Sequence, residues 1–138
     1  MSWKDYERRQ QLMDAVLDDV AASGDWRIPD RWQPEITAMF GGEAGFALAL
    51  YPRWFATLSA RLDAVLEELP ADLTGAAETE AVRLVRARPA MFAVLAAYAD
   101  HPELEAARHQ ERQYLDWAPA AQLPALAARL DDLLPVLV

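Results

Sequence analysis

Hydrophobic residues recur along this chain at intervals of three and four positions, the spacing that gathers side chains on one face of an α-helix. The pattern is most regular over about 51–69, and it predicts a long central helix there. Pro52 fits the first turn of that helix, so residues 43–50 are expected to form only one or two separate turns. The apolar residues of the central run are Tyr51, Trp54, Phe55, Leu58, Leu62, Val65, Leu66 and Leu69.

The same spacing, interrupted by proline and glycine, predicts further helices on both sides of the central one. No stretch alternates apolar and polar residues in the way a β-strand does. The chain is therefore predicted to be all-α, a single-domain helical bundle (residues 1–138) of six or seven helices. The additional helices are expected over about 3–22, 34–40, 75–87, 102–117 and 119–135, with one more that begins at Pro89. The first of them is expected to bury a face that carries Trp3, Tyr6, Met13, Val16, Leu17 and Val20.

Charge and composition narrow the classes of partner and compartment. The 138 residues carry 13 basic and 22 acidic side chains, a formal charge of -9, which repels nucleic acid and anionic lipid. There is no cysteine, and no window is apolar enough for a signal peptide or a membrane span. A cytoplasmic protein with no nucleic-acid or membrane partner is expected. The alanine excess and single lysine are typical of a chain encoded by a GC-rich bacterial genome.

The segment GDWRIPDRWQP, residues 24–34, concentrates large side chains where no regular period exists. Pro29 and Pro34 prevent a continuous helix, so the segment is expected to be a loop. Its aromatic and basic residues support two interpretations. They anchor a cover over the end of the bundle, or they form an interface, because Trp and Arg are enriched at binding hot spots. The residues concerned are Trp26, Arg27, Arg31 and Trp32.

Acidic residues concentrate around the connector that follows the central helix. Glu67, Glu68 and Asp72 are its main members, and they form either a solvated face or a surface that attracts a basic partner. Asp72 or Thr74 is also expected to cap the next helix, because short polar side chains favour that position.

A second functional class is a bundle that encloses a small, partly apolar or anionic ligand. Aromatic residues on inward faces would line its cavity, although such residues are more often plain core. Arginines close to the helix that begins at Pro89 would orient an anion at its free backbone amides. The residues of this alternative are Trp54, Phe55, Arg86, Arg88, Phe92, Tyr98 and Tyr114.

Catalytic chemistry has little support. His101, Glu105 and His109 are spaced four apart and would suit zinc or iron on one helix face, but Pro102 places His101 at or before the helix start. His101 is therefore expected to act as a cap residue. No GxSxG elbow is present, and GGEAG lacks the strand and lysine of a phosphate-binding loop.

The sequence thus favours a non-enzymatic, acidic helical protein that acts by binding another protein, as a homodimer, adaptor, inhibitor or immunity-type factor. It predicts no cofactor. The small-ligand bundle is the alternative, and a metal-dependent enzyme that uses His101, Glu105 and His109 is the least favoured interpretation.

Overall fold

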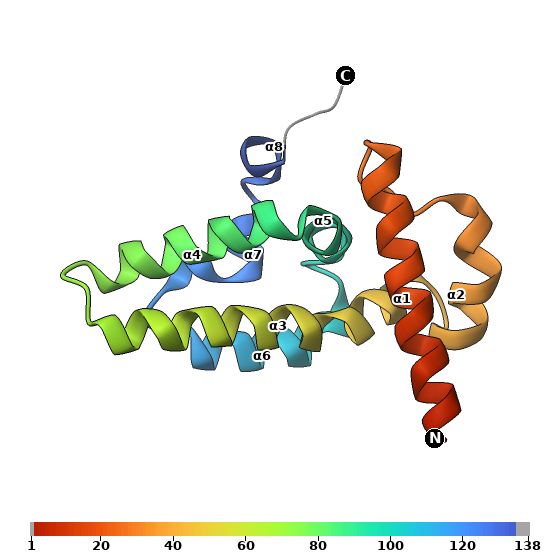
Figure 1. Cartoon of the computed structure of the whole chain (residues 1–138), viewed down its shortest axis with the longest axis horizontal. Coiled ribbons are helices and arrows are strands. Elements are labelled where there is room, and N and C mark those ends of the chain that lie inside the picture. Colours follow the sequence, from red (N-terminus) through yellow and green to blue (C-terminus); the bar gives the residue numbers. More distant parts are fainter. Residues whose placement is uncertain (1, 135–138) are drawn as a thin grey trace.

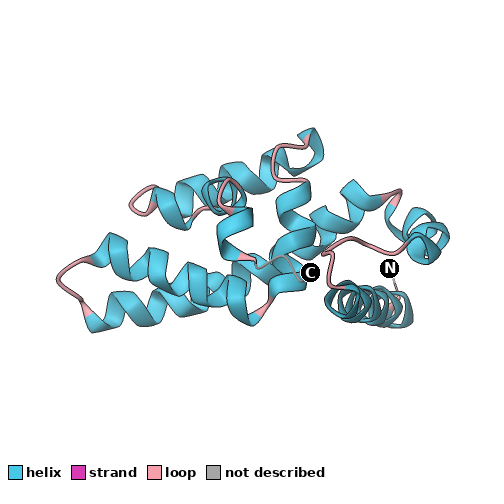
Figure 2. Ribbon diagram, turned by 90° about the horizontal axis from the view of Figure 1, so that it is seen from above, coloured by secondary structure: helices cyan, strands magenta, loops and turns pink. Residues whose placement is uncertain are grey.

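A computed structural model describes residues 2–134 of the chain. This part contains helices and no strand, so the all-α prediction is confirmed (Figures 1 and 2). No helix within it is both long and apolar enough to cross a membrane. The α-helices are α1 (Trp3–Ser23), α2 (Gln33–Phe40), α3 (Glu43–Glu68), α4 (Leu73–Ala87), α5 (Pro89–Ala97), α6 (Glu105–Tyr114), α7 (Leu123–Ala127) and α8 (Leu130–Leu133). Short 3-10 helices are η1 (Asp30–Trp32), η2 (Pro102–Leu104) and η3 (Pro119–Ala121).

Helix α3 lies at the centre of the fold and contacts α2, α4, α5 and α6. In Figure 1, α4 runs back beside α3 as a helical hairpin, α6 follows the other side of α3, and α1 and α2 lie at the opposite end from the hairpin turn. Helix α5 joins the two ends, because it packs against α1, α3, α4 and α7.

The central helix is confirmed, but it begins at Glu43 and not at Tyr51. Pro52 therefore lies inside a continuous helix, and its placement in a first turn was wrong. An interior proline removes one backbone hydrogen bond and costs about 3 kcal/mol. The helix continues because Phe46 and Leu50, before the proline, share one buried face with Trp54 after it.

Helix ends follow the local rules of capping. The Ser2 hydroxyl accepts a hydrogen bond of 3.2 Å from the Asp5 amide, and α1 stops at Gly24, which has a left-handed backbone (φ 75°). Asp72, one of the two expected caps, accepts a bond of 3.0 Å from the Gly75 amide. His101 caps η2 as expected, since its Nδ1 accepts from the Glu103 amide at 3.2 Å.

The single helix expected over 119–135 is wrong, because the segment is divided into η3, α7 and α8. Gln122 is extended (φ -74°, ψ 147°), and the next amide, that of Leu123, donates 2.5 Å to the Glu111 carboxylate. The Glu111 side chain thus accepts the hydrogen bond that the Leu123 amide would donate to a backbone carbonyl in a continuous helix. This division raises the number of α-helices within residues 2–134 to eight. Residues 135–138, the end of the expected helix, lie outside the described part.

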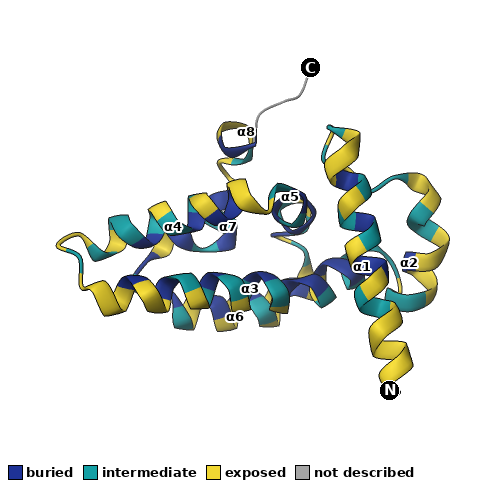
Figure 3. Ribbon diagram, in the orientation of Figure 1, coloured by how far each residue is buried: buried dark blue, intermediate teal, exposed yellow. Residues whose placement is uncertain are grey.

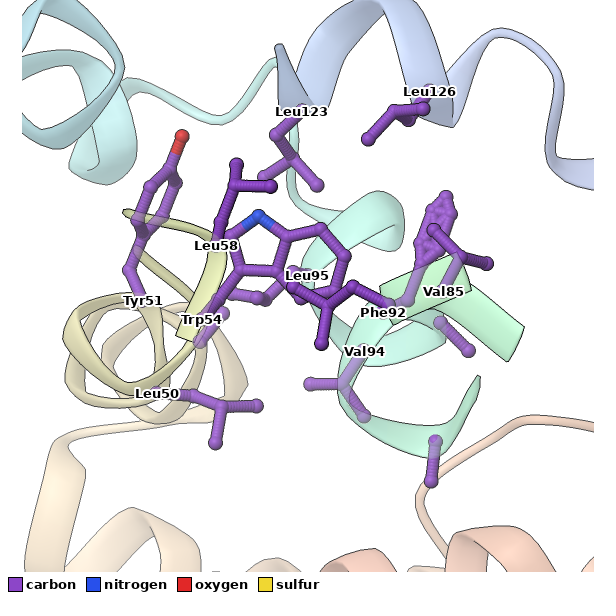
Figure 4. Close-up of a cluster of buried hydrophobic side chains, with 14 of the residues drawn as sticks. Leu50, Tyr51, Trp54, Leu58, Val85, Phe92, Val94, Leu95, Leu123 and Leu126 are labelled. Atoms are coloured by element: carbon purple, nitrogen blue, oxygen red, sulfur yellow. The ribbon is translucent and has the colours of Figure 1, made fainter. Parts of the chain in front are cut away.

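The core is built around an aromatic pair on α3 and α5. Trp54 and Phe92 are both fully buried, and their rings stack with centroids 5.8 Å apart (Figure 4). Leucines from α3, α5 and α7 surround the pair. The Trp54 indole Nε1 has no hydrogen-bond partner within residues 2–134, so this ring is held by apolar packing alone.

Pro52→Ala should stabilise the protein. Pro52 is exposed, so the change restores a helical N–H without opening a core cavity, and we expect the free energy of unfolding to rise by about 1–3 kcal/mol. Denaturant unfolding followed by circular dichroism measures this. Pro34→Ala is the matched control, because Pro34 is also exposed but lies in the first turn of α2, where proline is favourable. Equal effects of the two changes would contradict the explanation.

Candidate functional site

The Trp loop, residues 24–34, is tied down by two aspartates. Asp19 on α1 accepts 2.6 Å from the Trp32 indole Nε1 and is paired with Arg31, whose guanidinium lies 5.9 Å from the Trp32 ring centroid. These bonds from Arg31 and Trp32 lower the pKa of Asp19. Asp25 accepts from the Ser23 hydroxyl (2.8 Å) and the Arg27 amide (3.1 Å), which lowers its pKa as well. The loop is therefore an ordered part of the fold.

Trp26 and Trp32 are both half-buried and pack against the core, whereas Arg27 and Arg31 are exposed. Trp26 adopts a left-handed backbone (φ 61°), which is uncommon for a bulky residue. The arrangement matches the geometry expected of a cover, while an interface role for these four residues stays a prediction.

A cavity of about 410 Å³ lies beneath this loop, and we call it the Trp26 pocket. Trp26 and Arg27 line it from the loop, Tyr98 lines it from the end of α5, and Glu43 lines it from the first turn of α3. Asp30 adds a second carboxylate, and Ala93, Val94 and Ala97 of α5 make an apolar wall. Trp26 and Tyr98 were singled out separately from the sequence, and the fold brings them to one cavity.

Glu43 is fixed in the Trp26 pocket by two donors. Its Oε1 accepts 2.5 Å from Gln33 Nε2, and its Oε2 accepts from the Tyr98 hydroxyl. Burial, together with the Glu43 bond and charge, raises the pKa of Tyr98 to about 12, so Tyr98 stays a neutral donor. Sequence reasoning missed Glu43, because its partners lie 10 and 55 positions away.

The acidic end of the molecule is the turn between α3 and α4. Glu67, Glu68 and Asp72 are exposed there, with Asp72 engaged as the cap of α4. Leu69 projects from the same turn with 79% of its surface exposed and a left-handed backbone (φ 46°), and Leu66 beside it is 37% exposed. Figure 3 shows this turn as an exposed tip. We refer to Leu66, Leu69 and the three carboxylates as the acidic end.

A separate apolar face covers the start of α1 and the middle of α3. Trp3 and Tyr6 were expected to be buried, but they are 71% and 48% exposed, and their rings stack on each other at 5.7 Å. The expectation failed because, within residues 2–134, no other helix covers the first turns of α1 (Figure 1). Tyr6 and Pro52 border a groove of about 490 Å³, and Pro52 and Leu48 border a second groove of about 390 Å³.

The aromatic residues predicted to line a ligand cavity do not gather around one cavity but fall into three separate places. Trp54 and Phe92 are core residues, and Tyr98 belongs to the Trp26 pocket. Phe55 and Tyr114 pack edge to face at 5.3 Å, with the Tyr114 hydroxyl donating 3.0 Å to Asp63.

The predicted anion site is also open to solvent. Arg86 and Arg88 are both exposed, and Arg88 lines a shallow groove of about 620 Å³ between α1 and the start of α5. Asp14 and Asp18 line the same groove, so it does not present the uniform positive charge that an anion favours.

The predicted metal ligands are engaged in other contacts. His101 is the cap described above, and Glu105 pairs with Arg108 (2.5 Å) and Arg112 (3.1 Å), which lowers the pKa of Glu105. His109 is exposed. Within residues 2–134, no group of three His, Asp or Glu side chains is placed to hold a metal ion.

A buried carboxylate was missed entirely. Glu111 on α6 is fully buried, and it accepts 2.9 Å from the Tyr51 hydroxyl and 2.5 Å from the Leu123 amide. Burial raises the pKa of Glu111, because desolvation opposes its charged form more than the two bonds favour it. The same burial, together with the charge of Glu111, raises the pKa of Tyr51. The polar pattern of α6 gave no sign that one of its acids faces the core.

Comparison with protein-family models, with curated proteins and with solved structures found no match. The Trp26 pocket, the acidic end and the apolar face are the features of the described structure that suit binding.

Glu111→Gln should stabilise the protein increasingly as pH rises. The folded pKa of Glu111 lies above its ordinary value of 4.5, so ionisation opposes folding above that value and not below it. The stability gap between variant and wild type should widen from pH 4 upward, by about 1.4 kcal/mol for each unit of pKa shift, and then level off. Urea unfolding at a series of pH values measures this gap. Glu103→Gln, at an exposed position, is the control, and a flat gap for Glu111→Gln would contradict the account.

Proposed function

We propose that this chain is a protein-binding module whose acidic end docks onto a basic, partly apolar segment of another protein. The observation that carries the proposal is Leu69, a large apolar side chain almost wholly exposed between Glu67, Glu68 and Asp72. An exposed apolar side chain surrounded by carboxylates is complementary to an amphipathic segment that presents both hydrophobic and positively charged side chains.

The backbone of Leu69 supports this interpretation. A helix that ends with a left-handed residue normally has glycine there, because a side chain adds about 1 kcal/mol of strain. Leu69 carries that strain without burying its side chain, so it contributes little to the stability of the folded chain. Residues held in strained conformations are often ones that contact a ligand.

Charge favours a foreign partner over a second copy of the chain. Two copies that each carry a charge of -9 repel one another, whereas a basic partner is attracted over a Debye length of about 10 Å at 0.1 M salt. Within the acidic end, no arginine is paired with Glu67 or Glu68 in the described structure, so their charge is available to a partner. The neighbouring Glu78 and Glu80, by contrast, are paired with Arg129 and Arg61.

The first experiment locates the contact by site-specific crosslinking. A photoreactive benzoylphenylalanine replaces Leu69 in one sample and Trp3 in another, in cells that naturally express the chain. The two positions are comparably exposed, at 79% and 71%, so both probes meet solvent equally. We expect position 69 to crosslink mainly to one protein. The peptide of that protein that carries the crosslink should be rich in basic residues. The same adduct from position 3 alone would move the interface to the apolar face and contradict the proposal, and a crosslinked second copy would identify a homodimer.

Leu69→Gly should separate stability from binding. Removal of the side chain relieves the left-handed strain, so the free energy of unfolding should stay equal or rise by up to about 1 kcal/mol. Affinity for the crosslinked partner should fall roughly tenfold or more, since an interface anchor contributes at least about 1.4 kcal/mol. Titration calorimetry and denaturant unfolding measure the two effects.

Leu69→Ala is the matched variant, because it removes the contact but keeps the strain, and it should lose affinity without the gain in stability. Added salt should weaken the association. Unchanged affinity in both variants, or association that strengthens with salt, would show that the acidic end is not the contact.

A further inference from the structure

The Trp26 pocket combines the three features that recognise an organic cation. Two aromatic side chains, Trp26 and Tyr98, line a cavity of about 410 Å³, which lies within the usual range of about 300–1,000 Å³ for small-molecule sites. Two carboxylates, Glu43 and Asp30, line the same cavity, and the wall formed by α5 is apolar. We propose that this pocket binds a small ligand with an alkylammonium group and a short apolar body, independently of any protein partner.

The aromatic rings argue for a cation. The face of an indole or phenol ring carries negative electrostatic potential, and tryptophan gives the strongest attraction for an ammonium group. Trp26 is held at the pocket by a loop that Asp25 fixes through two hydrogen bonds, and the left-handed backbone of Trp26 is part of that fixed geometry. The backbone that carries the ring is therefore preorganised, so little ordering of the loop is needed when a ligand enters.

Glu43 supplies the charge at a defined point. One oxygen of its carboxylate accepts from Gln33 and the other from Tyr98, so the group is oriented by both of its neighbours. A carboxylate has about four lone-pair sites, and these two bonds leave further acceptor capacity for an N–H or O–H donor of a ligand, while its negative charge attracts an ammonium group that has no N–H. The Tyr98 hydroxyl keeps its proton and donates a hydrogen bond to Glu43, so the ring stays neutral.

The charges around the cavity exclude other ligand classes. Glu43 and Asp30 outweigh the one guanidinium, that of Arg27, so an anion is disfavoured. Two carboxylates without a third ligand do not make a metal site, in agreement with the absence of such a group from residues 2–134. An alkylammonium ion satisfies both the carboxylates and the apolar wall. Arg27 is a like charge at the edge of the cavity, and it should weaken binding.

Choline is the probe, and 3,3-dimethylbutan-1-ol is its uncharged counterpart of nearly the same shape. In proton–nitrogen NMR spectra each of the five tryptophans gives one indole signal, and Trp26→Phe identifies that of Trp26. We expect choline to shift the Trp26 signal saturably, with a Kd of about 1 mM or below, and to leave the signal of exposed Trp3 unchanged. The uncharged alcohol should bind about tenfold more weakly or not at all. Sodium chloride at equal ionic strength controls for screening.

Two variants are expected to change the affinity for choline in opposite directions. Glu43→Gln removes the charge but keeps an acceptor for Tyr98, and it should weaken choline binding about fivefold or more. Arg27→Ala removes the like charge from an exposed side chain and should strengthen binding. Equal binding of choline and the alcohol, a choline shift at Trp3 as large as at Trp26, or no saturable shift would each overturn the proposal. Because the probe comparison and Arg27→Ala leave Glu43 in place, they decide the question even if Glu43→Gln unfolds.

Discussion

Burial of one continuous face of α3 is the constraint on which the other helices depend, since α2, α4, α5 and α6 all pack against this element. The constraint is strong enough to carry the helix through Pro52. Full burial of a large apolar side chain contributes about 1.5–3 kcal/mol, so Phe46 and Leu50 together offset the roughly 3 kcal/mol that an interior proline costs. A break at Pro52 would instead have turned these two side chains away from Trp54 and left α2 without a surface to pack on.

Three carboxylates fix parts of the chain that local helix rules do not determine. Asp19 binds Arg31 and Trp32 of the Trp loop, Glu43 binds Gln33 and Tyr98, and Glu111 binds Tyr51 and the Leu123 amide. In each case one acid accepts from two donors that lie far from it in the sequence. The bonds therefore set the position of the loop, the shape of the Trp26 pocket and the point at which the C-terminal helices divide. The chain has no cysteine and so no disulfide to hold these irregular segments, and the three acceptors fix them instead.

Both proposed sites attract positive charge, and this follows from how the arginines are used. Seven arginines of the described structure are held in ion pairs with carboxylates. The excess negative charge, a net value of -9, therefore lies mainly on acidic residues that have no such partner. The two sites also share a backbone property. Trp26 and Leu69 are the non-glycine residues with positive φ within residues 2–134, and each presents its side chain at one of the sites. Backbone strain at a large side chain is thus common to both places.

The sequence by itself determined the all-α fold, the central helix and most helix ends, because these depend on interactions within a few residues. Ser2, Asp72 and His101 act as caps through local bonds that their neighbours dictate. It also indicated Trp26, Tyr98 and the acidic connector as distinctive. Only the tertiary structure decided that Trp3 is exposed, that Glu111 divides the last helix and that Glu43 joins Trp26 and Tyr98 in one pocket. These features depend on which elements come together in the folded chain. The periodicity of apolar residues indicates which face of a helix is apolar, but it does not indicate which other element will cover that face.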